Sequence, residues 1–223
     1  MEFRHEWKHV ITEADRIAIR QRMGAVGRPD IHGQSGKYQV RSLYFDNLRD
    51  KALQEKLNGV SRREKFRIRL YDLDDRVIHL ECKRKMAGLG HKDSCALTAD
   101  EAHAIQRGQT DWMARDDRML VRELHHKMRT QGLLPRTLVD YTREAFVYPA
   151  GNVRVTLDHH IRTGLHRTDL LDPRCPTVPV PGDPILLEVK WDGFLPDVIR
   201  DVIQLDGVRS TAFSKYAACR MYD

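Results

Sequence analysis

The fold is decided by residues 65–71, KFRIRLY, in which charged and apolar side chains alternate. A period of two places successive side chains on opposite faces of a β-strand. One face therefore carries Lys65, Arg67 and Arg69, whereas the other face is apolar. The stretch predicts a strand with one basic face.

The same alternation recurs in four later segments. Their charged faces carry Glu81, Lys83 and Lys85; Tyr141 and Arg143; Arg154, Thr156 and Asp158; and Glu188 and Lys190. A single strand of this kind ordinarily has one face in water. Five such strands set Lys and Arg on neighbouring strands, where like charges repel. A bound polyanion would offset that repulsion, so we expect the charged faces to surround one.

About seven or eight strands are expected, and seven are located over residues 3–8, 38–45, 65–71, 77–85, 136–148, 152–163 and 185–191. Helices are expected over about residues 12–23, 46–57, 112–130 and 196–205, with further ones opening at Thr98 and Ser214. Loops are expected over residues 24–37 and 169–183 and in the glycine-rich stretch with Gly88, Gly90 and Lys92.

This arrangement predicts an α+β fold, with residues 1–223 forming one domain. Closing the mainly antiparallel sheet into a β-barrel of about eight strands would enclose the charged faces and leave the apolar faces for helices packed outside.

Composition narrows the class of partner. The net charge is +6 and the pI about 9.2, which favours an acidic partner. Residues 1–6, MEFRHE, are too charged for a signal peptide, and no apolar run is long enough for a transmembrane segment. Four scattered cysteines predict reduced thiols in a cytoplasmic protein. Aromatic residues make up only 7%, and basic residues alternate inward, so nucleic acid is not the expected partner.

Eight short motifs occur in order along nearly the whole chain. They are RHEWK at 4–8, SLYFDN at 42–47, FRIRLY at 66–71, LECKRK at 80–85, YTREAF at 141–146, VRVTLD at 153–158, LEVK at 187–190 and FSKY at 213–216. Together they resemble the VTC domain, a polyphosphate polymerase domain of the triphosphate tunnel metalloenzyme (CYTH-like) superfamily. The resemblance implies an eight-stranded antiparallel tunnel.

The resemblance also implies roles for individual residues. It implies phosphate contacts by Lys8, Arg67, Arg69, Lys83, Arg143, Arg154 and Lys215, and a divalent cation, Mn²⁺ or Mg²⁺, held by Glu188. Lys85, Tyr141 and Lys190 lie on the same charged faces and complete the expected phosphate-binding set. Glu6 and Glu81 are the further candidate metal ligands, with Asp158 left open as another, because hard cations take oxygen donors. Phosphoryl transfer needs mainly positioning and charge neutralisation, so the residues expected to be catalytic are Lys8, Arg67, Arg69 and Lys83.

The residue at position 4, which is Arg4 here, distinguishes two branches of this superfamily. The triphosphatase branch carries ExExK on its first strand, and Arg4 stands here in place of the first Glu. This favours transfer of the γ-phosphoryl of ATP to a polyphosphate chain. The expected partners are ATP, triphosphate or polyphosphate, and a membrane-protein partner is left open. The alternatives are hydrolysis of inorganic triphosphate or a related ester, and non-enzymatic sensing of polyphosphate.

Overall fold

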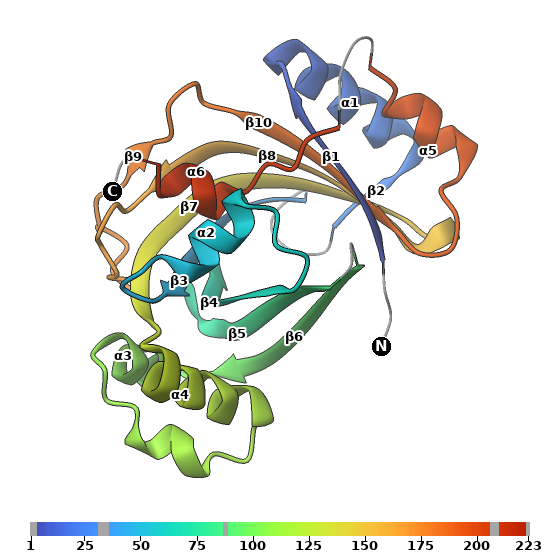
Figure 1. Cartoon of the computed structure of the whole chain (residues 1–223). Helices are drawn as coiled ribbons and strands as arrows, with labels where there is room; N and C mark the ends of the chain where they lie inside the picture. Colours follow the sequence, from blue (N-terminus) through green and yellow to red (C-terminus); the bar gives the residue numbers. More distant parts are fainter. Residues whose placement is uncertain (1–3, 31–35, 87–88, 206–209, 222–223) are drawn as a thin grey trace. The chain divides into compact units, whose positions relative to one another are not determined.

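The computed structural model describes residues 4–30, 36–86, 89–205 and 210–221. An antiparallel sheet follows the order β1-β10-β8-β7-β3-β4-β5-β6, and short strands β2 and β9 pair with β7 and β8 (Figure 1). The strands are β1 (His5–Ile11), β2 (Arg28–Pro29), β3 (Lys37–Asp46), β4 (Arg63–Tyr71), β5 (Asp74–Met86), β6 (Leu89–Leu97), β7 (Leu134–Tyr148), β8 (Val153–Thr163), β9 (Val178–Pro179) and β10 (Ile185–Trp191).

Helices accompany this sheet. They are α1 (Glu13–Val26), α2 (Lys51–Leu57), α3 (Ala99–Gln106), α4 (Met119–Gln131), α5 (Asp197–Val202) and α6 (Lys215–Cys219), with single 3-10 turns η1 (Asp111–Arg115) and η2 (Ala150–Asn152). The predicted α+β class and the antiparallel sheet with eight main strands are confirmed. No helix in the described part of the chain is long and apolar enough to cross a bilayer.

Strand β6 is the main difference from the sequence-based prediction, which placed a loop there. Residues 89–97 have few β-branched side chains, yet they pair along their whole length with β5, so that Gly90 lies opposite Lys85 and Lys92 opposite Lys83. Backbone pairing in a hairpin outweighs the weak strand propensity. Gly88 lies outside the described residues, as do Phe3 of the first expected strand and residues 31–35 of the expected loop.

Two helices also differ from their predicted extents. Helix α2 begins at Lys51, five residues after the predicted start at Asp46, because Asp46 ends β3 and Asp50 has a left-handed backbone with φ of 53°. The helix predicted over residues 112–130 is two elements, η1 and α4, since Asp116 between them is extended.

The chain forms two compact units. Unit 1 comprises Met1–Gln39, Tyr141–Ile161 and Pro179–Ser214, and unit 2 comprises Val40–Asp140, Arg162–Val178 and Lys215–Asp223. Each unit has a hydrophobic core of its own, and these cores determine which face of each strand carries charge.

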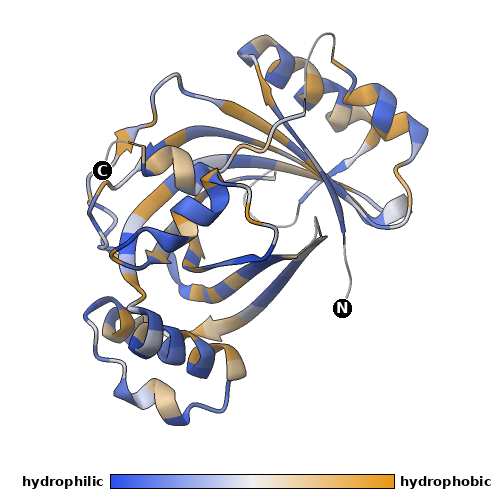
Figure 2. Ribbon diagram, in the orientation of Figure 1, coloured by the Kyte–Doolittle hydropathy of each residue, from blue (hydrophilic) through white to orange (hydrophobic). Residues whose placement is uncertain are grey.

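The core of unit 1 lies on the apolar face of β8 and β10. Val155 and Leu187 on these strands are buried and belong to one cluster with Ile19 of α1 and Ile199 of α5. Helix α1 begins at a capping box in which the Thr12 hydroxyl accepts a hydrogen bond from the Asp15 backbone and Asp15 returns one. The alternate residues of β8 and β10 therefore point away from this core. Figure 2 shows that hydrophobic and hydrophilic residues are mixed along the strands of the sheet.

The core of unit 2 lies on the apolar face of β4 and β5. Phe66, Ile68 and Leu80 are buried there together with Ile105 of α3 and Leu124 of α4. Because side chains alternate along a strand, the intervening Lys and Arg residues of β4 and β5 lie on the opposite face.

Asp46, at the end of β3, anchors two helices of unit 2. Asp46 is only 1% exposed. Its side chain accepts hydrogen bonds from the backbone N–H groups of Ala52 (2.9 Å) and Leu53 (3.1 Å) at the start of α2. The hydroxyl of Tyr216 in α6 donates to the same carboxylate at 2.6 Å, and Arg220 donates to that hydroxyl at 2.9 Å. The carboxylate thus caps α2 and fixes α6.

We expect Asp46→Ala to lower the free energy of unfolding of the protein by about 3 kcal/mol, because it removes a helix cap and leaves the buried Tyr216 hydroxyl without its acceptor. Urea denaturation followed by circular dichroism measures the change. Asp74→Ala is the control, since Asp74 bonds to the exposed Arg76, and it should leave stability unchanged. Equal effects of the two substitutions would contradict the anchoring role.

Candidate functional site

In unit 2, a set of charged side chains of β4, β5 and β6 lies on the face opposite the core, whereas Glu64, Arg84 and Asp93 lie on the core-side face and pair with one another or with α4. Lys65 pairs in register with Lys83, and Lys83 with Lys92, so three lysines form a row across the three strands. Over residues 63–69 and the described residues opposite them, the register places on the face away from the core the cations Arg63, Lys65, Arg67, Arg69, Lys83, Lys85 and Lys92 and the single carboxylate Glu81. Like charges directly opposite one another repel, so this face is suited to a polyanion.

Glu81 holds the centre of this face. One oxygen accepts a hydrogen bond from Nε of Arg67 at 2.7 Å and the other from Nζ of Lys92 at 2.8 Å, while Arg69 approaches to 3.7 Å. Burial alone would raise the pKa of Glu81, but the charges of Arg67, Arg69 and Lys92 outweigh it and hold that pKa well below its usual range. The ionised carboxylate thereby fixes the direction of the Arg67 guanidinium.

Tyr44 of β3 fixes the other side of Arg67. Its hydroxyl accepts a hydrogen bond from Nη1 of Arg67 at 2.8 Å, and its ring stacks on Tyr216 with centroids 5.0 Å apart. Burial favours a raised pKa for Tyr44, but the positive charges of Arg67, Arg69 and Lys65 dominate and lower it to about 8. The phenol therefore reports a strongly positive potential at this face.

The neighbouring cations of unit 2 are also held by their surroundings. Arg69 is 5% exposed, and its Nε donates to the Ser42 hydroxyl at 3.0 Å. Nζ of Lys65 lies 5.7 Å from the centre of the Tyr216 ring, and Lys215 precedes Tyr216 at the start of α6. Unit 2 thus brings together, on β4 and β5, the expected residues Arg67, Arg69, Glu81, Lys83 and Lys85, and it also contains Lys215.

In unit 1, the charged face of β1, β10 and β8 pairs opposite charges. Nζ of Lys8 lies 3.0 Å from Glu188 and 3.7 Å from Glu6, and Nζ of Lys190 lies 3.4 Å from each of these glutamates. The strand register explains the pattern, because Lys8 lies opposite Glu188 and Glu6 opposite Lys190. Continuing across the sheet, Glu188 lies opposite Thr156 on β8.

The other two expected cations of unit 1, Arg143 and Arg154, have buried acidic partners. Arg143 makes two parallel bonds, of 2.6 and 2.7 Å, to the fully buried Asp158, and lies over the Tyr141 ring at 5.3 Å. Burial opposes the charge of Arg143, but Asp158 outweighs it and raises the pKa of Arg143 well above its ordinary value. Burial lowers the pKa of Lys190 despite the two glutamates beside it. All four expected cations of unit 1 are therefore matched by carboxylates, since Arg154 pairs with Asp30.

The expected metal ligands are divided between the two units. Glu6, Asp158 and Glu188 belong to unit 1 and Glu81 to unit 2, and the described residues contain no group of three or more His, Cys, Asp or Glu that could hold a metal ion. Asp158 is held by its two bonds from Arg143. Glu6 and Glu188 offer a pair of hard oxygen donors, which also face two lysines at 3.0–3.7 Å. Glu81 fits a cation less well, because its contacts with Arg67 and Lys92 are shorter, at 2.7 and 2.8 Å.

Arg4 is turned to a different partner. Its Nε lies 2.8 Å from Asp192, and its Nη2 donates to the backbone oxygen of Asn152. The residue that replaces the first Glu of ExExK therefore has its charge balanced within unit 1 by a carboxylate other than Glu6 or Glu188.

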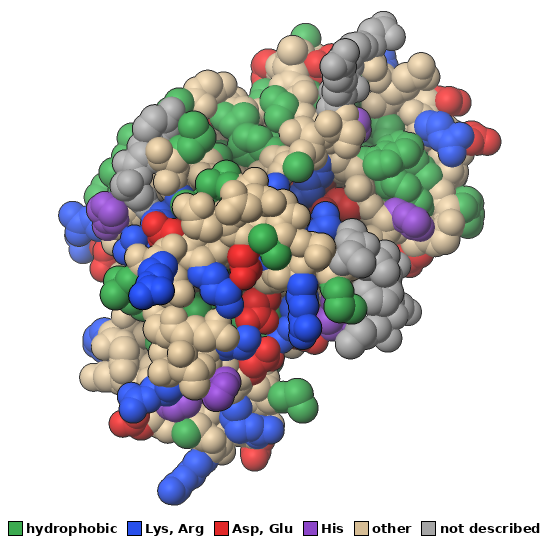
Figure 3. Space-filling view, viewed as in Figure 1, with side chains coloured by type: hydrophobic (Ala, Val, Ile, Leu, Met, Phe, Trp, Pro, Cys, Tyr) green, Lys and Arg blue, Asp and Glu red, His purple; other side chains and the backbone are tan. Residues whose placement is uncertain are grey.

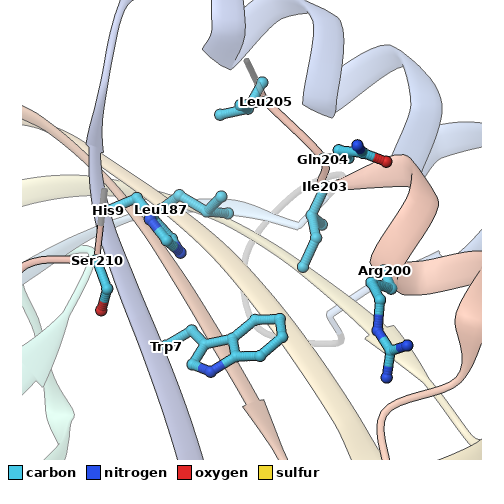
Figure 4. Close-up of a pocket in the computed structure, with 8 residues that line it drawn as sticks. All are labelled: Trp7, His9, Leu187, Arg200, Ile203, Gln204, Leu205 and Ser210. Carbon is cyan, nitrogen blue, oxygen red and sulfur yellow. The ribbon is translucent and has the colours of Figure 1, made fainter. Parts of the chain in front are cut away.

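A cavity of about 270 Å³ in unit 1 lies on the other face of β1 (Figure 4). Trp7 and His9 line it, and they alternate along β1 with Glu6 and Lys8. The remaining lining residues are Leu187, Arg200, Ile203, Gln204, Leu205 and Ser210. Because it lies on the face opposite Lys8, this cavity is distinct from the charged site.

Some residues of these clusters were not predicted as site residues. Tyr44 lies within the SLYFDN motif, Lys92 lies in a stretch expected to be a loop, and Asp30 and Tyr38, which both bind Arg154, lie outside the expected charged faces. Their positions follow from strand register and from loops that fold back, which a single sequence does not specify.

Figure 3 shows Lys and Arg interspersed with Asp and Glu on the face in view.

A family model described as the VTC domain matches residues 3–222 of this chain. The chain belongs to the VTC domain family. The match spans both compact units, and it confirms the resemblance seen in the eight motifs. No curated protein matches the chain significantly.

One solved structure supports the fold, and two others are less similar. A "putative adenylate cyclase" from Bacillus halodurans is similar to the VTC chain with a TM-score of 0.53 and 14% identity, covering 90% of this chain and 86% of that one. A protein of the same printed name from Vibrio parahaemolyticus has a TM-score of 0.46 and 11% identity, covering 90% and 82%. A Pyrococcus horikoshii protein has a TM-score of 0.45 and 13% identity, covering 90% and 84%. At 14% identity, the similarity to the Bacillus halodurans structure is evidence for the fold of this VTC domain and not for its activity.

The low pKa of Tyr44 gives a spectroscopic prediction. The ultraviolet absorbance of the tyrosinate should show an ionisation near pH 8 that Tyr44→Phe removes, because the charges of Arg67, Arg69 and Lys65 lower the pKa of Tyr44. Adding tripolyphosphate should move that step to higher pH, since a bound anion cancels the positive potential. Tyr148→Phe, in unit 1, is the control and should keep the step; a step that tripolyphosphate leaves in place would contradict phosphate binding at this face.

Glu81 gives a prediction on stability. Its pKa is lowered on folding, so its stabilising effect is present above its ordinary pKa of about 4.3 and is lost as the pH falls. Glu81→Gln should therefore lower the free energy of unfolding by about 3 kcal/mol at pH 7, because Arg67 and Arg69 lose their counter-charge. The difference between variant and wild type should shrink below pH 4. Urea unfolding at both pH values measures it, and a difference independent of pH would show that the charge is not the cause.

Proposed function

We propose that this VTC domain is a metal-dependent phosphotransferase of the polyphosphate polymerase type. It transfers the γ-phosphoryl of ATP to the end of a polyphosphate chain. The observation that carries the proposal is the charged face of β4, β5 and β6, where seven cations accompany one carboxylate. Membership of the VTC domain family supports the same substrate class.

The unit 2 face suits a chain of phosphates better than a single one. The lysine row of Lys65, Lys83 and Lys92 runs across three strands, and neighbouring strands are about 4.8 Å apart. Cations are therefore repeated along the row, as a linear polyanion requires. Arg67 supplies a planar fork whose direction is set by Glu81 and Tyr44, and such a fork matches two phosphate oxygens.

The unit 1 face suits a different role. Because Lys8 and Lys190 are balanced there by Glu6 and Glu188, this face has little net attraction for a phosphate chain. We assign Glu6 and Glu188 as the carboxylates that hold Mn²⁺ or Mg²⁺. Glu6 and Glu188 would hold the cation, which would supply neutralisation of the charge that develops during phosphoryl transfer. Binding it would release Lys8 and Lys190 from the glutamates to donate to phosphate oxygens.

Polymerisation is favoured over hydrolysis by Arg4. A carboxylate at this position would add a ligand for the cation, whereas Arg4 pairs with Asp192 and adds none. No residue is needed as a covalent nucleophile, because the acceptor is the terminal oxygen of the growing chain. Arg67, Arg69, Lys83 and Lys8 then act by positioning and charge neutralisation, and Lys85, Tyr141, Arg143, Arg154, Lys190 and Lys215 complete the proposed phosphate-binding set.

The test is incubation of the purified protein with ATP and Mn²⁺, with products resolved on a polyacrylamide gel and by orthophosphate release. We expect long polymer. Orthophosphate alone would replace the proposal with triphosphate hydrolysis, and tight tripolyphosphate binding without turnover would replace it with a sensor.

Substitutions test the assignment of the face. Arg67→Ala and Lys83→Ala should each weaken tripolyphosphate binding about tenfold or more, because each removes a charge-assisted contact. Isothermal titration calorimetry measures the affinity. Arg174→Ala removes a cation of unit 2 that is 93% exposed, and it should leave the affinity unchanged. Unchanged affinity in Arg67→Ala and Lys83→Ala would place the phosphate site elsewhere.

A further inference from the structure

Thr156 is a buried polar residue on the charged face of unit 1 that no expected role explains. The residue is 4% exposed, and its hydroxyl oxygen has no hydrogen-bond partner among the described residues. A buried hydroxyl left unsatisfied costs about 1–3 kcal/mol, so such a group calls for a partner. Valine would have almost the same shape without this cost.

The position of Thr156 indicates what that partner is. Thr156 lies directly opposite Glu188 in the β8–β10 register, and Lys8 lies opposite Glu188 on the other side. Side chains of directly opposed residues have Cβ atoms about 5 Å apart. The Thr156 hydroxyl is therefore close enough to Glu188 for a single metal-bound ligand to link it to a cation held by that carboxylate.

Other polar groups of this face are already matched. Asp158 accepts both bonds of Arg143, and Arg154 binds Asp30 and Tyr38. In the described part of this strand face, Nε of Arg154 and the Thr156 hydroxyl are buried atoms without a hydrogen-bond partner, but Arg154 is held through its Nη2, whereas Thr156 has no other polar side-chain atom. A divalent cation such as Mg²⁺ keeps several bound waters, which need hydrogen-bond partners from the protein.

We propose that the Thr156 hydroxyl is an outer ligand of the cation site at Glu6 and Glu188, hydrogen-bonded to a water bound to the metal. The inference rests on the proposed metal-binding role of these glutamates. Thr156 orients a ligand of the metal and makes no direct bond to it, so it is a positioning residue. Such partners of metal ligands typically contribute about 10–100-fold to metal affinity.

The experiment is a titration of the full chain with Mn²⁺, following free Mn²⁺ by electron paramagnetic resonance, without any phosphate present. Thr156→Val should weaken Mn²⁺ binding about tenfold, whereas Thr156→Ser, which keeps the hydroxyl, should stay within about threefold of wild type. In the absence of metal, Thr156→Val should be at least as stable as wild type in urea, because the hydroxyl that it removes makes no hydrogen bond with the described residues. Should Thr156→Val fail to fold, Thr156→Ala carries the same expectation for affinity.

Thr137→Val is the matched control. Thr137 is fully buried in unit 2, and its hydroxyl contacts the Leu138 carbonyl at 3.2 Å and the Thr163 hydroxyl at 3.4 Å. This substitution should lower stability and leave Mn²⁺ affinity unchanged, which is the opposite pattern to that of Thr156→Val.

Three results would overturn the inference. They are wild-type Mn²⁺ affinity in Thr156→Val, a loss of affinity seen only when tripolyphosphate is present, and absence of Mn²⁺ binding by the wild-type chain. The second would mean that the hydroxyl contacts a phosphate oxygen and not a metal-bound water. Mn²⁺ binding that depends on the Thr156 hydroxyl, in a protein that makes no polymer from ATP, would overturn the polymerase proposal alone.

Discussion

The row of like charges formed by Lys65, Lys83 and Lys92 is the constraint on which the organisation of unit 2 depends. Directly opposed lysines repel, and the sheet tolerates them because the other face of the same strands buries Phe66 and Leu80 against α3 and α4. Apolar burial thus fixes the register, and the register forces the cations together. The electrostatic cost is retained where a ligand of opposite charge can offset it.

Supporting groups then give this charge a direction. Glu81 and Tyr44 hold Arg67 from two sides, and Tyr216 stacks on Tyr44 while its hydroxyl donates to Asp46. Through Asp46, the same carboxylate that caps α2 also fixes α6, the helix that begins at Lys215. One buried group, Asp46, therefore supports both the stability of α2 and α6 and the geometry of the basic face.

Unit 1 arranges the charged residues of its paired strands differently. Its register sets Lys8 against Glu188 and Glu6 against Lys190, so that opposite charges neutralise one another on paired strands. A nearly balanced face attracts anions weakly, and it places two carboxylates beside the same pair of lysines, which is the basis of the proposed cation site. The two faces, each described within its own unit, thus differ in the chemistry they favour, although the alternating sequence pattern that produces them is the same.

The sequence by itself determined the fold class, the charged and apolar faces of the strands, and the family, because all three depend on local alternation and on short motifs with fixed spacing. Only the tertiary structure decided which charges are paired. The partners of Arg67, Arg143 and Arg154 come from other strands and loops, and β6 is a strand because β5 offers it backbone hydrogen bonds. Register and pairing are non-local properties, set by cores that assemble residues distant in the chain, so the composition of a single strand cannot specify them.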